Sequence, residues 1–480
     1  EYKDAFLIFS FVGMTSQEVA YNGQAVQNVI LSADSETLGE VVVTGLQTIE
    51  KGRATGSFTI LKNEDMDNVV STDFREKLIG AASGVYIDKD NNLMIRGQGT
   101  LLGNKKPLIV LDGIPLESSE LNLNPNDIDQ ISVLKDAASA SIWGVRAANG
   151  VVVITTKRGA KNGKLAVSYS GSYSIEDKVD IGDYHRLNAS EYAELEFERS
   201  LGKGIFRWSD TDGYNQVQKV WIDYEEQGSI SLDEARARIA EIGAFDNESQ
   251  IEDLFYQRKT VQRHNISLTT GTDKASHYFS VNYDKTDQEL LGNSADKINF
   301  IGNTDVNLAK GIDLQIGLRG TYQKGNNNGN GSAWEMLPYQ RILDEDGAYV
   351  DQNHSISENY RDLLDASGFL DWSQNNLRKV RLNDKTKETT NVATSLKLDI
   401  ELIKGLKFTS FGSYETGRTE GRNLYRSEHD YVRDLKNSYT EVDDTETPEI
   451  IACHLPKKGG ILDLSFDQTK SFAIRNTLQY

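Results

Sequence analysis

The sequence predicts a mainly β protein, in which a compact α/β unit precedes one part of a transmembrane antiparallel β-barrel. Three observations support this fold class. Residues 46–160 mix short apolar strands with turn signals and brief helical segments. From Leu165 onward, apolar and polar residues alternate with a period of two, as in strands with two different faces. The links between these strands are short and long in turn, which is typical of outer-membrane barrels.

Composition narrows the function classes. The 480 residues carry a formal net charge of −20, and the sequence pI is about 4.9. This charge disfavours a nucleic-acid partner, because the phosphate backbone attracts basic surfaces. Cys453 is the only cysteine, so no internal disulfide can form. The longest apolar run, at residues 5–13, is far shorter than the roughly 20 residues of a membrane-spanning helix.

The N-terminal region reads as short strands and linkers. Residues 5–31 contain short apolar runs that predict strands, and a polar linker follows at 32–39. The next predicted strand comprises Glu40, Val41, Val42, Val43, Thr44 and Gly45. Its β-branched residues favour extended backbone, and loops on both sides predict an isolated strand that needs a partner. An ordinary buried strand of a neighbouring domain is one interpretation of this segment.

The α/β unit contains capped helices and short strands. Ser71 or Asp73 is placed to cap a helix over 74–79. Asp136 is placed to cap a helix that begins at 137–140, which is too short to be stable without tight packing. Strands are predicted at 85–87, 93–95, 108–111 and 151–154. The last of these is an unbroken apolar run, so we expect it to be buried on both faces.

Eight candidate strands follow the α/β unit. They lie at residues 165–174, 265–271, 277–286, 297–308, 312–324, 391–402, 406–414 and 471–480. Three of the links are turns of a few residues, whereas those at 175–264, 325–390 and 415–470 run for dozens of residues. A soluble β-sandwich would show the same alternation of side chains. The asymmetry between short and long links favours a membrane barrel.

The long links carry their own signals. Asn188 with Glu191, and Ser231 with Glu234, have capping-box spacing, which predicts helices over 190–201 and 232–242. Aromatic residues stand among polar ones at Trp208, Trp221, Trp334, Tyr339, Tyr360 and Trp372. Such rings either stack on sugar faces or hold the loops to one another, and for each single ring the second role is the default expectation.

The strand at 312–324 makes the faces of the sheet explicit. Leu314, Ile316 and Leu318 alternate with Gln315 and Arg319. Because successive side chains of a strand point to opposite faces, we expect the apolar three to face lipid and the polar two to face the lumen.

Several segments resemble the plug-domain signature of the SusC/RagA-like TonB-dependent outer-membrane transporters. The most specific are NPNDIDQISVLKDAASA at 124–140 and ANGVVVITTKRG at 148–159. The segments SGVYI at 83–87, LMIRG at 93–97 and PLIVLDGIP at 107–115 match the same pattern in the same order.

The resemblance implies a domain organisation. Residues 1–37 would end a small carboxypeptidase-regulatory-like β-sandwich, and 38–45 would be the TonB box, in which Glu40–Gly45 adds as a strand to TonB. Residues 46–160 would form the plug and 161–480 the first part of the barrel. Barrels of this type have about 22 strands, so most of the barrel would lie outside this sequence. Both ends of the sequence look cut.

The resemblance also implies a function. It is TonB-dependent import of a large nutrient, an oligosaccharide or a peptide, across the outer membrane of a Gram-negative bacterium, with a SusD-like surface lipoprotein as a partner. Two alternatives remain at this point. One is a narrower TonB-dependent receptor for an iron chelate or cobalamin. The other is a soluble carbohydrate-active β-sandwich enzyme, which would need a pair of catalytic carboxylates.

Signals for other chemistry are weak. The six histidines show no zinc-type spacing, and no G-x-S-x-G motif occurs. The acidic stretch at 344–347 fits a turn better than a calcium loop, because Ile342 and Asn353 would occupy the two end ligand positions. We therefore expect no catalytic residue, no metal site and no cofactor.

Overall fold

The computed structural model describes most of the chain, in two compact units: Glu1–Lys157 and Arg158–Tyr480. The described residues are 6–9, 17–20, 29, 41–43, 48–50 and 57–480, without 67–72, 90–91, 98–104, 117–122, 137–140, 205–212, 330–332, 334–335, 353–354, 444–448 and 457.

The first unit begins with two small hairpins. Strand β1 (Phe6–Phe9) pairs with β2 (Gln17–Ala20), and β3 (Val41–Val43) pairs with β4 (Thr48–Glu50), both antiparallel. The sequence predicted an isolated strand at 40–45. That prediction was wrong for Val41–Val43, because the following residues fold back and form a partner strand. Glu40, Thr44 and Gly45 lie outside the described residues, as does the linker at 32–39.

A five-stranded sheet forms the centre of the first unit. Its order is β5-β10-β11-β8-β9. The strands are β5 Phe58–Lys62, β8 Leu108–Leu111, β9 Ile114–Leu116, β10 Ile128–Leu134 and β11 Val151–Thr156. Strand β11 is parallel to β8 and antiparallel to β10. Its residues Val151–Ile154 are buried, which confirms the prediction from their unbroken apolar run.

Short elements surround this sheet. They are α1 Asn63–Met66, α2 Phe74–Leu78, the hairpin of β6 Val85–Ile87 and β7 Leu93–Ile95, and the 3₁₀ segments η2 Pro125–Asp127 and η3 Ser141–Ala147. Asp73 caps α2 by accepting from the backbone N–H of Arg75 at 2.9 Å, as predicted. The helix expected at 137–140 lies outside the described residues, and the Asp136 carboxylate accepts from the backbone N–H of Ser57.

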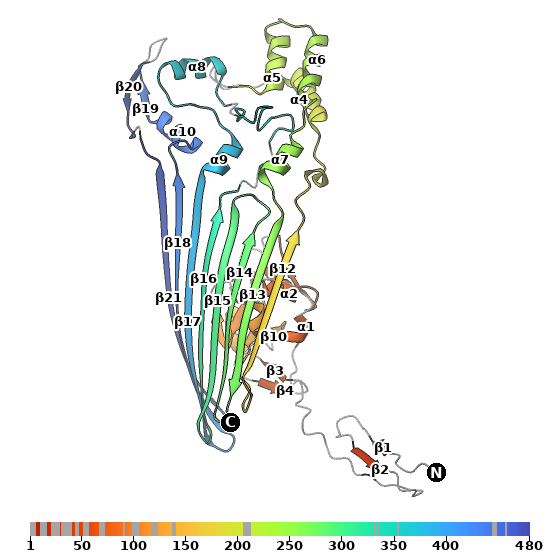
Figure 1. The fold of residues 1–480 in the computed structure, drawn as a ribbon, viewed down its shortest axis with the longest axis vertical. Helices are drawn as coiled ribbons and strands as arrows, with labels where there is room; N and C mark the ends of the chain where they lie inside the picture. The colour runs from red at the N-terminus through yellow and green to blue at the C-terminus, as the bar shows by residue number, and fades with distance from the viewer. Residues whose placement is uncertain are drawn as a thin grey trace. The chain divides into compact units, whose positions relative to one another are not determined.

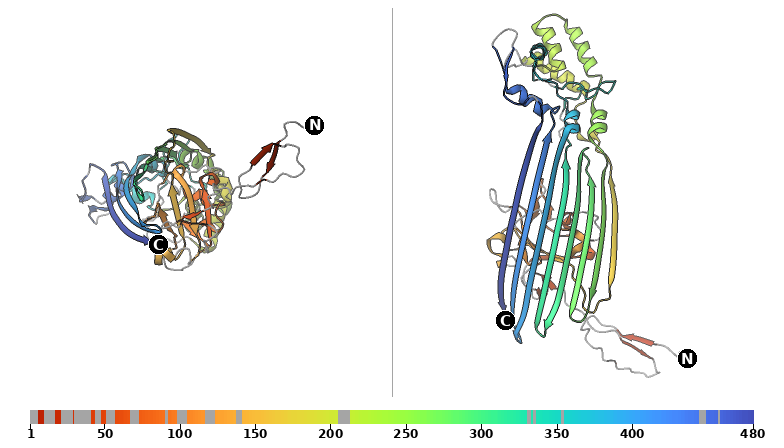
Figure 2. Two further views of the ribbon diagram at one scale, coloured as in Figure 1. Left: turned by 90° about the horizontal axis from the view of Figure 1, so that it is seen from below. Right: turned by 60° about the vertical axis from the view of Figure 1, so that its left-hand side comes forward.

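The second unit is built on an eight-stranded sheet of order β12-β13-β14-β15-β16-β17-β18-β21, in which every neighbouring pair is antiparallel. The long strands lie side by side and the sheet is curved (Figures 1 and 2). The strands are β12 Ala166–Glu176, β13 Lys259–Gly271, β14 Ala275–Asp287, β15 Asn293–Ala309, β16 Ile312–Asn327, β17 Asn383–Ile403, β18 Leu406–Tyr425 and β21 Ile461–Gln479. All eight predicted strands are confirmed.

Tight turns join the strands at one end of this sheet. The turns lie at 272–274, 310–311 and 404–405, within the three short links that the sequence predicted at 272–276, 309–311 and 403–405. Gly311 and Gly405 have φ values of 78° and 88° there. This left-handed conformation is costly for residues that have a Cβ, so glycine suits both turns.

Helices occupy the three long links at the opposite end of the sheet (Figure 1). The first link contains η4 Ile181–Tyr184, α4 Ala189–Lys203, α5 Gln216–Trp221, the π-helical η5 Ile222–Glu226, α6 Leu232–Ile242 and α7 Glu248–Phe255. The second contains α8 Glu358–Ala366 and α9 Asn376–Leu382, and the third contains α10 Asp430–Ser438 with the strands β19 Thr440–Val442 and β20 Ile450–Cys453. Among the described residues, no helix has the length and apolar character needed to cross a membrane.

The predicted capping boxes begin α4 and α6. Asn188 accepts from the N–H of Glu191 at 2.9 Å, and Glu191 accepts in return from the N–H of Asn188 at 3.2 Å. Ser231 and Glu234 form the same reciprocal pair. The backbone N–H and the hydroxyl of Ser231 both donate to the Glu234 carboxylate. These hydrogen bonds hold the pKa of Glu234 below its usual range. These caps satisfy N–H groups that the helix itself leaves without partners.

Candidate functional site

In the eight-stranded sheet, apolar side chains are exposed on one face and polar side chains are buried on the other, which is the reverse of a soluble protein. Ile316 and Leu318 are 36% and 44% exposed, whereas Asn282 and Asp284 are 0% and 3% exposed. Exposed apolar and aromatic side chains recur on every strand of the sheet: Val167, Tyr169, Ile266, Phe279, Val281, Ile298, Phe300, Ile316, Leu318, Val392, Leu396, Tyr414, Phe472 and Ile474. A sheet with such a surface requires an apolar environment.

The strand register places these side chains on one face. Residues directly opposite each other in neighbouring strands point to the same side. Ile316 is paired with Leu396, and Leu318 is paired with Gly302, which in turn is paired with the exposed Phe279. Leu314 belongs to the same face, and it is less exposed than Ile316 and Leu318. The predicted separation of the even-numbered residues from Gln315 and Arg319 is therefore present.

The opposite face is polar and carries ion pairs. The guanidinium Nε of Arg263 lies 2.9 Å from Asp284 Oδ1, and Lys297 Nζ lies 3.5 Å from Asp284 Oδ2. Register places these three residues in one row across β13, β14 and β15. Further along the sheet, Arg319 Nη2 lies 3.1 Å from Glu415 Oε2. These charged groups are thus paired with one another, and the most buried of them, Arg263 and Asp284, need such pairing most.

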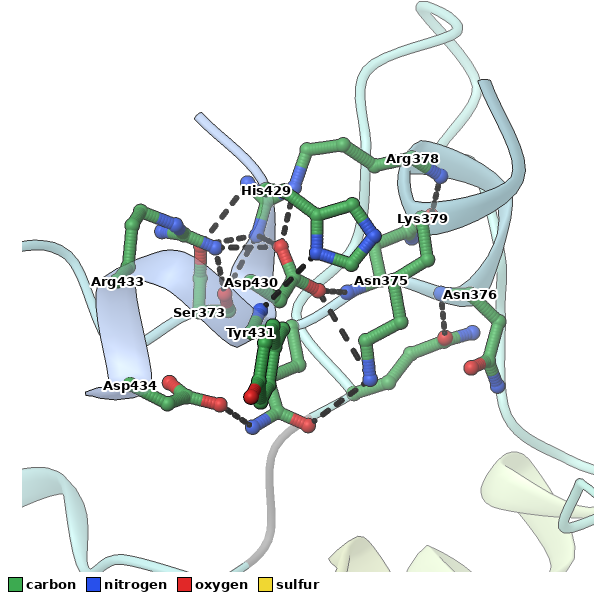
Figure 3. Close-up of polar contacts among 12 residues, drawn as sticks. Ser373, Asn375, Asn376, Arg378, Lys379, His429, Asp430, Tyr431, Arg433 and Asp434 are labelled. Atoms are coloured by element: carbon green, nitrogen blue, oxygen red, sulfur yellow. Dashed lines mark hydrogen bonds and ion pairs between the residues drawn. The ribbon is translucent and has the colours of Figure 1, made fainter. Parts of the chain in front are cut away.

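A second polar cluster joins two of the long links (Figure 3). Its centre is Asp430, the first residue of α10, which is 1% exposed. Asp430 Oδ1 lies 2.9 Å from Arg378 Nη2 and 2.6 Å from Arg433 Nη2. Asp430 Oδ2 accepts from the backbone N–H of Asn375 at 3.1 Å. One carboxylate therefore connects α9 to α10, whose residues are about 50 positions apart in the sequence.

Two neighbours complete this cluster. Arg433 also donates to the backbone oxygen of Asp371 at 2.7 Å. Asn375 caps α9 and donates its Nδ2 to the backbone oxygens of Ile342 and Val350, at 2.9 and 2.8 Å. The cluster thus fixes the backbone of the second and third long links relative to each other. No single local motif in the sequence predicted it, because its members come from separate segments.

His429 is the N-cap of α10 and contacts the end of the sheet. Its Nδ1 accepts from the backbone N–H of Tyr431 at 3.1 Å, so Nε2 carries the hydrogen and donates to Asn383 Oδ1 at 3.1 Å. Burial lowers the pKa of His429; Asp430 opposes this shift, and Lys385, Lys379 and Arg433 add to it. The neutral imidazole is therefore the form that suits this geometry.

The predicted aromatic residues of the loops separate into different roles. Trp221 and Tyr339 are 6% and 3% exposed and pack in a helical core with Phe197. The Tyr339 hydroxyl donates to Glu196 Oε2 at 2.7 Å. These two rings hold loops together. Tyr360 lies half-buried on α8, Trp372 lines a pocket, and Trp208 and Trp334 lie outside the described residues.

Carboxylate groups of Asp180, Glu248 and Glu252 approach one another within 4.8 Å. Asp180 is exposed, and both Asp180 and Glu252 already accept backbone N–H groups, from Gly182 and Ile181 respectively. These contacts give the group a structural role at the start of η4. The acidic stretch near Asp344 forms a turn in which the carboxylate accepts from the N–H of Ala348 at 2.8 Å.

Comparison with known proteins identifies the first unit. Residues 50–151 match the family of the TonB-dependent receptor plug domain. TonB-dependent receptor SusC of Bacteroides thetaiotaomicron is 34% identical over 246 residues, which cover 47% of this chain and 24% of SusC. TonB-dependent receptor P26 of Formosa agariphila is 30% identical over 356 residues, which cover 72% of this chain and 33% of P26. The chain thus spans a quarter to a third of the length of these relatives.

Solved structures share the fold. The RagAB peptide importer in its closed-closed state gives a TM-score of 0.59 at 19% sequence identity, over 78% of this chain and 42% of that chain. Its open-open state gives a TM-score of 0.58 at 20% identity, over 81% and 43% of the two chains. The sequence relatives, the plug domain and this shared architecture agree. The chain therefore belongs to the SusC/RagA-like TonB-dependent receptors, which are β-barrel proteins of the Gram-negative outer membrane.

Proposed function

We propose that this protein imports an oligosaccharide, or a peptide, across the outer membrane with energy supplied through TonB. The observation that carries the proposal is the presence, in one chain, of a plug-type domain and a sheet whose apolar face is exposed. SusC and P26 support a TonB-dependent process, and the fold relationship to a peptide importer keeps peptides among the cargo classes. No bond in the cargo is broken, so the protein acts as a transporter and not as an enzyme.

The domain organisation follows from the same proposal. We assign residues 1–37 to the end of a β-sandwich, 38–45 to the TonB box, 46–160 to the plug and 161–480 to part of the barrel. The plug occludes the barrel, since a barrel of about 22 strands would otherwise leak. A SusD-like surface lipoprotein covers the loop end of the barrel.

TonB engages the segment Glu40–Gly45 by strand addition. The pairing of Val41–Val43 with Thr48–Glu50 supports this assignment, because a two-stranded hairpin leaves the second edge of β3 open among the described strands. An added strand would bond to that edge through main-chain groups. Alternatively, TonB replaces β4 as the partner of β3. A hairpin of three pairs is weak, so either route costs little.

The uptake experiment compares a deletion strain with its complemented parent on a panel of neutral glycans, peptides, iron chelates and cobalamin. Loss of growth on one glycan or peptide, with recovery on complementation, supports the proposal. Loss confined to an iron chelate or cobalamin would replace it with the narrower receptor.

The TonB assignment is tested with Val42→Pro, which removes a backbone donor and disfavours strand pairing. Uptake should collapse, whereas the amount of protein in the outer membrane and its binding of cargo should stay normal. Val42→Ala keeps the backbone donor and serves as the matched control, with uptake near wild type. Normal uptake by Val42→Pro would remove the TonB role of this segment.

A further inference from the structure

A pocket lies between the second and third long links. Its volume is about 410 Å³. It is lined by Ser355, Ile356, Trp372, Gln374, Tyr431, Asp434, Leu435 and Ser438. Pockets that bind small molecules combine apolar and aromatic walls with a few placed polar groups, and this lining has that composition. The Asp430 cluster adjoins the pocket, so α10 and the 371–379 segment are held in place beside it.

Two aromatic rings of the pocket are supported by other rings. The Tyr431 ring lies 5.1 Å from the Tyr425 ring, measured between centroids, and the Trp372 ring lies 6.2 Å from the Phe369 ring. Tyr431 is nevertheless 48% exposed. An exposed ring that is fixed from behind offers a flat surface at low entropic cost, because binding does not need to order it.

The polar side of the pocket contains an acceptor with spare capacity. Asp434 Oδ2 accepts from Gln374 Nε2 at 2.9 Å. Asp434 Oδ1 is buried and has no hydrogen-bond partner among the described residues. Burial raises the pKa of Asp434, and the Asp430 carboxylate adds to this rise, whereas Arg433 and Lys379 oppose it. A rotation of the Asp434 carboxylate toward the pocket would let the hydroxyl of a bound molecule donate to this orphan oxygen.

We propose that this pocket binds one or two pyranose units of a neutral oligosaccharide, with Tyr431 and Trp372 against the sugar faces and the Asp434 carboxylate accepting from a hydroxyl. This inference deepens the proposed function and rests on it, since the pocket would hold the cargo during import. The flat apolar face of a sugar ring matches an aromatic surface, and its hydroxyl groups match a carboxylate and an amide.

The charges of the pocket favour a neutral sugar. The lining side chains that the structure describes include no lysine or arginine, so a uronate or sulfated sugar would bring its anion next to Asp434 without a counter-charge.

The binding experiment uses the protein purified from outer membranes in detergent and measures affinity by calorimetry. The probes are neutral hexose and pentose oligosaccharides, the corresponding uronate oligomers and a lysine-containing peptide. At least one neutral oligosaccharide should bind, and the uronate oligomer should bind at least about tenfold more weakly. Tyr431→Ala should weaken neutral-sugar binding about three- to tenfold.

Asp434→Asn replaces the acceptor Oδ1 with a donor or a neutral acceptor and keeps the size of the side chain. It should weaken binding about tenfold.

Tyr439→Ala is the matched control for Tyr431→Ala, because Tyr439 is a 54% exposed tyrosine at the C-cap of the same helix and does not line the pocket. Its affinity should equal that of wild type, and melting curves of all variants show whether the fold is kept.

Three results would overturn the pocket proposal: binding only of the peptide, equal binding of uronate and neutral oligomers, or equal loss in Tyr431→Ala and Tyr439→Ala. These outcomes are separate from failure of the proposed function. The affinity measurement does not involve TonB, whereas the uptake measurement with Val42→Pro does. Import of a peptide, with no sugar bound, would keep the transporter and remove only this pocket's assignment.

Discussion

The ring of Phe300 lies directly over Gly320 of the neighbouring strand. The two residues are paired in the register of β15 and β16, and a Cβ built on Gly320 would lie 2.0 Å from a ring carbon of Phe300. Gly302 has a similar relationship with Phe279, at 3.1 Å. Each ring covers backbone that a glycine leaves bare on the exposed face of the sheet. Aromatic residues stabilise glycines in strands in this way.

Gly320→Ala should therefore destabilise the folded barrel by about 1 kcal/mol, because the Phe300 ring must move away from the strand. In a Phe300→Ala background, the same substitution should cost almost nothing. Unfolding in urea, monitored by the shift between folded and unfolded bands on gels, measures both effects. Gly412→Ala is the control, since no atom lies within 4 Å of its added Cβ. Equal costs at positions 320 and 412 would contradict the role of the ring.

Ile316→Lys should reduce the yield of folded barrel, and Gln315→Lys should leave it near wild type. Ile316 lies on the exposed apolar face and Gln315 on the polar one. A lysine near the lipid midplane costs about 2–4 kcal/mol, whereas the lumen tolerates charge. Heat resistance on gels and the outer-membrane level report the difference. Equal tolerance at both positions would show that this face does not meet lipid.

Asp430→Asn should loosen both long links around the pocket. It leaves the partly buried guanidinium groups of Arg378 and Arg433 without their shared charge, and breaking a buried pair in this way costs about 3–5 kcal/mol. Hydrogen exchange should rise in the segments 371–379 and 429–437, with no change in the strands. Glu428→Gln alters an exposed neighbouring carboxylate and should change neither segment. Exchange rates unaltered by Asp430→Asn would argue against the cluster as a support.

The N-cap of α10 should respond to pH. His429 has a lowered pKa in the folded protein, so its contribution to local stability is complete above the ordinary value of about 6.5 and declines as the pH falls below it. Protonated Nδ1 cannot accept from the N–H of Tyr431. Proteolysis near α10 should thus accelerate between pH 7 and pH 5. His429→Asn supplies a cap that does not titrate and should abolish this dependence. A variant that keeps the full pH dependence would assign it to another group.

The sequence predicted the membrane-facing parts of the strands in the second unit better than the ends of those strands. Strand β17 was predicted from residue 391 but begins at Asn383, and β18 continues to Tyr425 instead of ending at 414. Residues 383–390 are all polar, so no alternation marks them as a strand. They are extended because β16 and β18 hydrogen-bond to them through the main chain. The period-two alternation of apolar residues marks the part of a strand that faces lipid. It cannot mark a polar extension of the strand that is held only by main-chain hydrogen bonds.

The loop cluster was beyond sequence reasoning for a different reason. The capping boxes of α4 and α6 are local, and their spacing was sufficient to predict both helices. Asp430, by contrast, gains its distant partners Asn375 and Arg378 from the start of α9, 55 and 52 residues away in the sequence. Only the folding of both links over the same end of the sheet brings these charges together. The sequence predicted an isolated strand at 40–45, and it did not predict the local partner that Val41–Val43 finds at Thr48–Glu50.

The tight turns at one end of the sheet have a consequence for how such proteins diversify. Residues 272–274, 310–311 and 404–405 fix the pairing of their strands independently of the long links at the other end. An insertion, deletion or exchange in a long link therefore changes the surface at that end of the sheet without shifting the register within any of these three hairpins. The long links of one relative can thus be transplanted onto the hairpins of another with the pairing inside each hairpin kept.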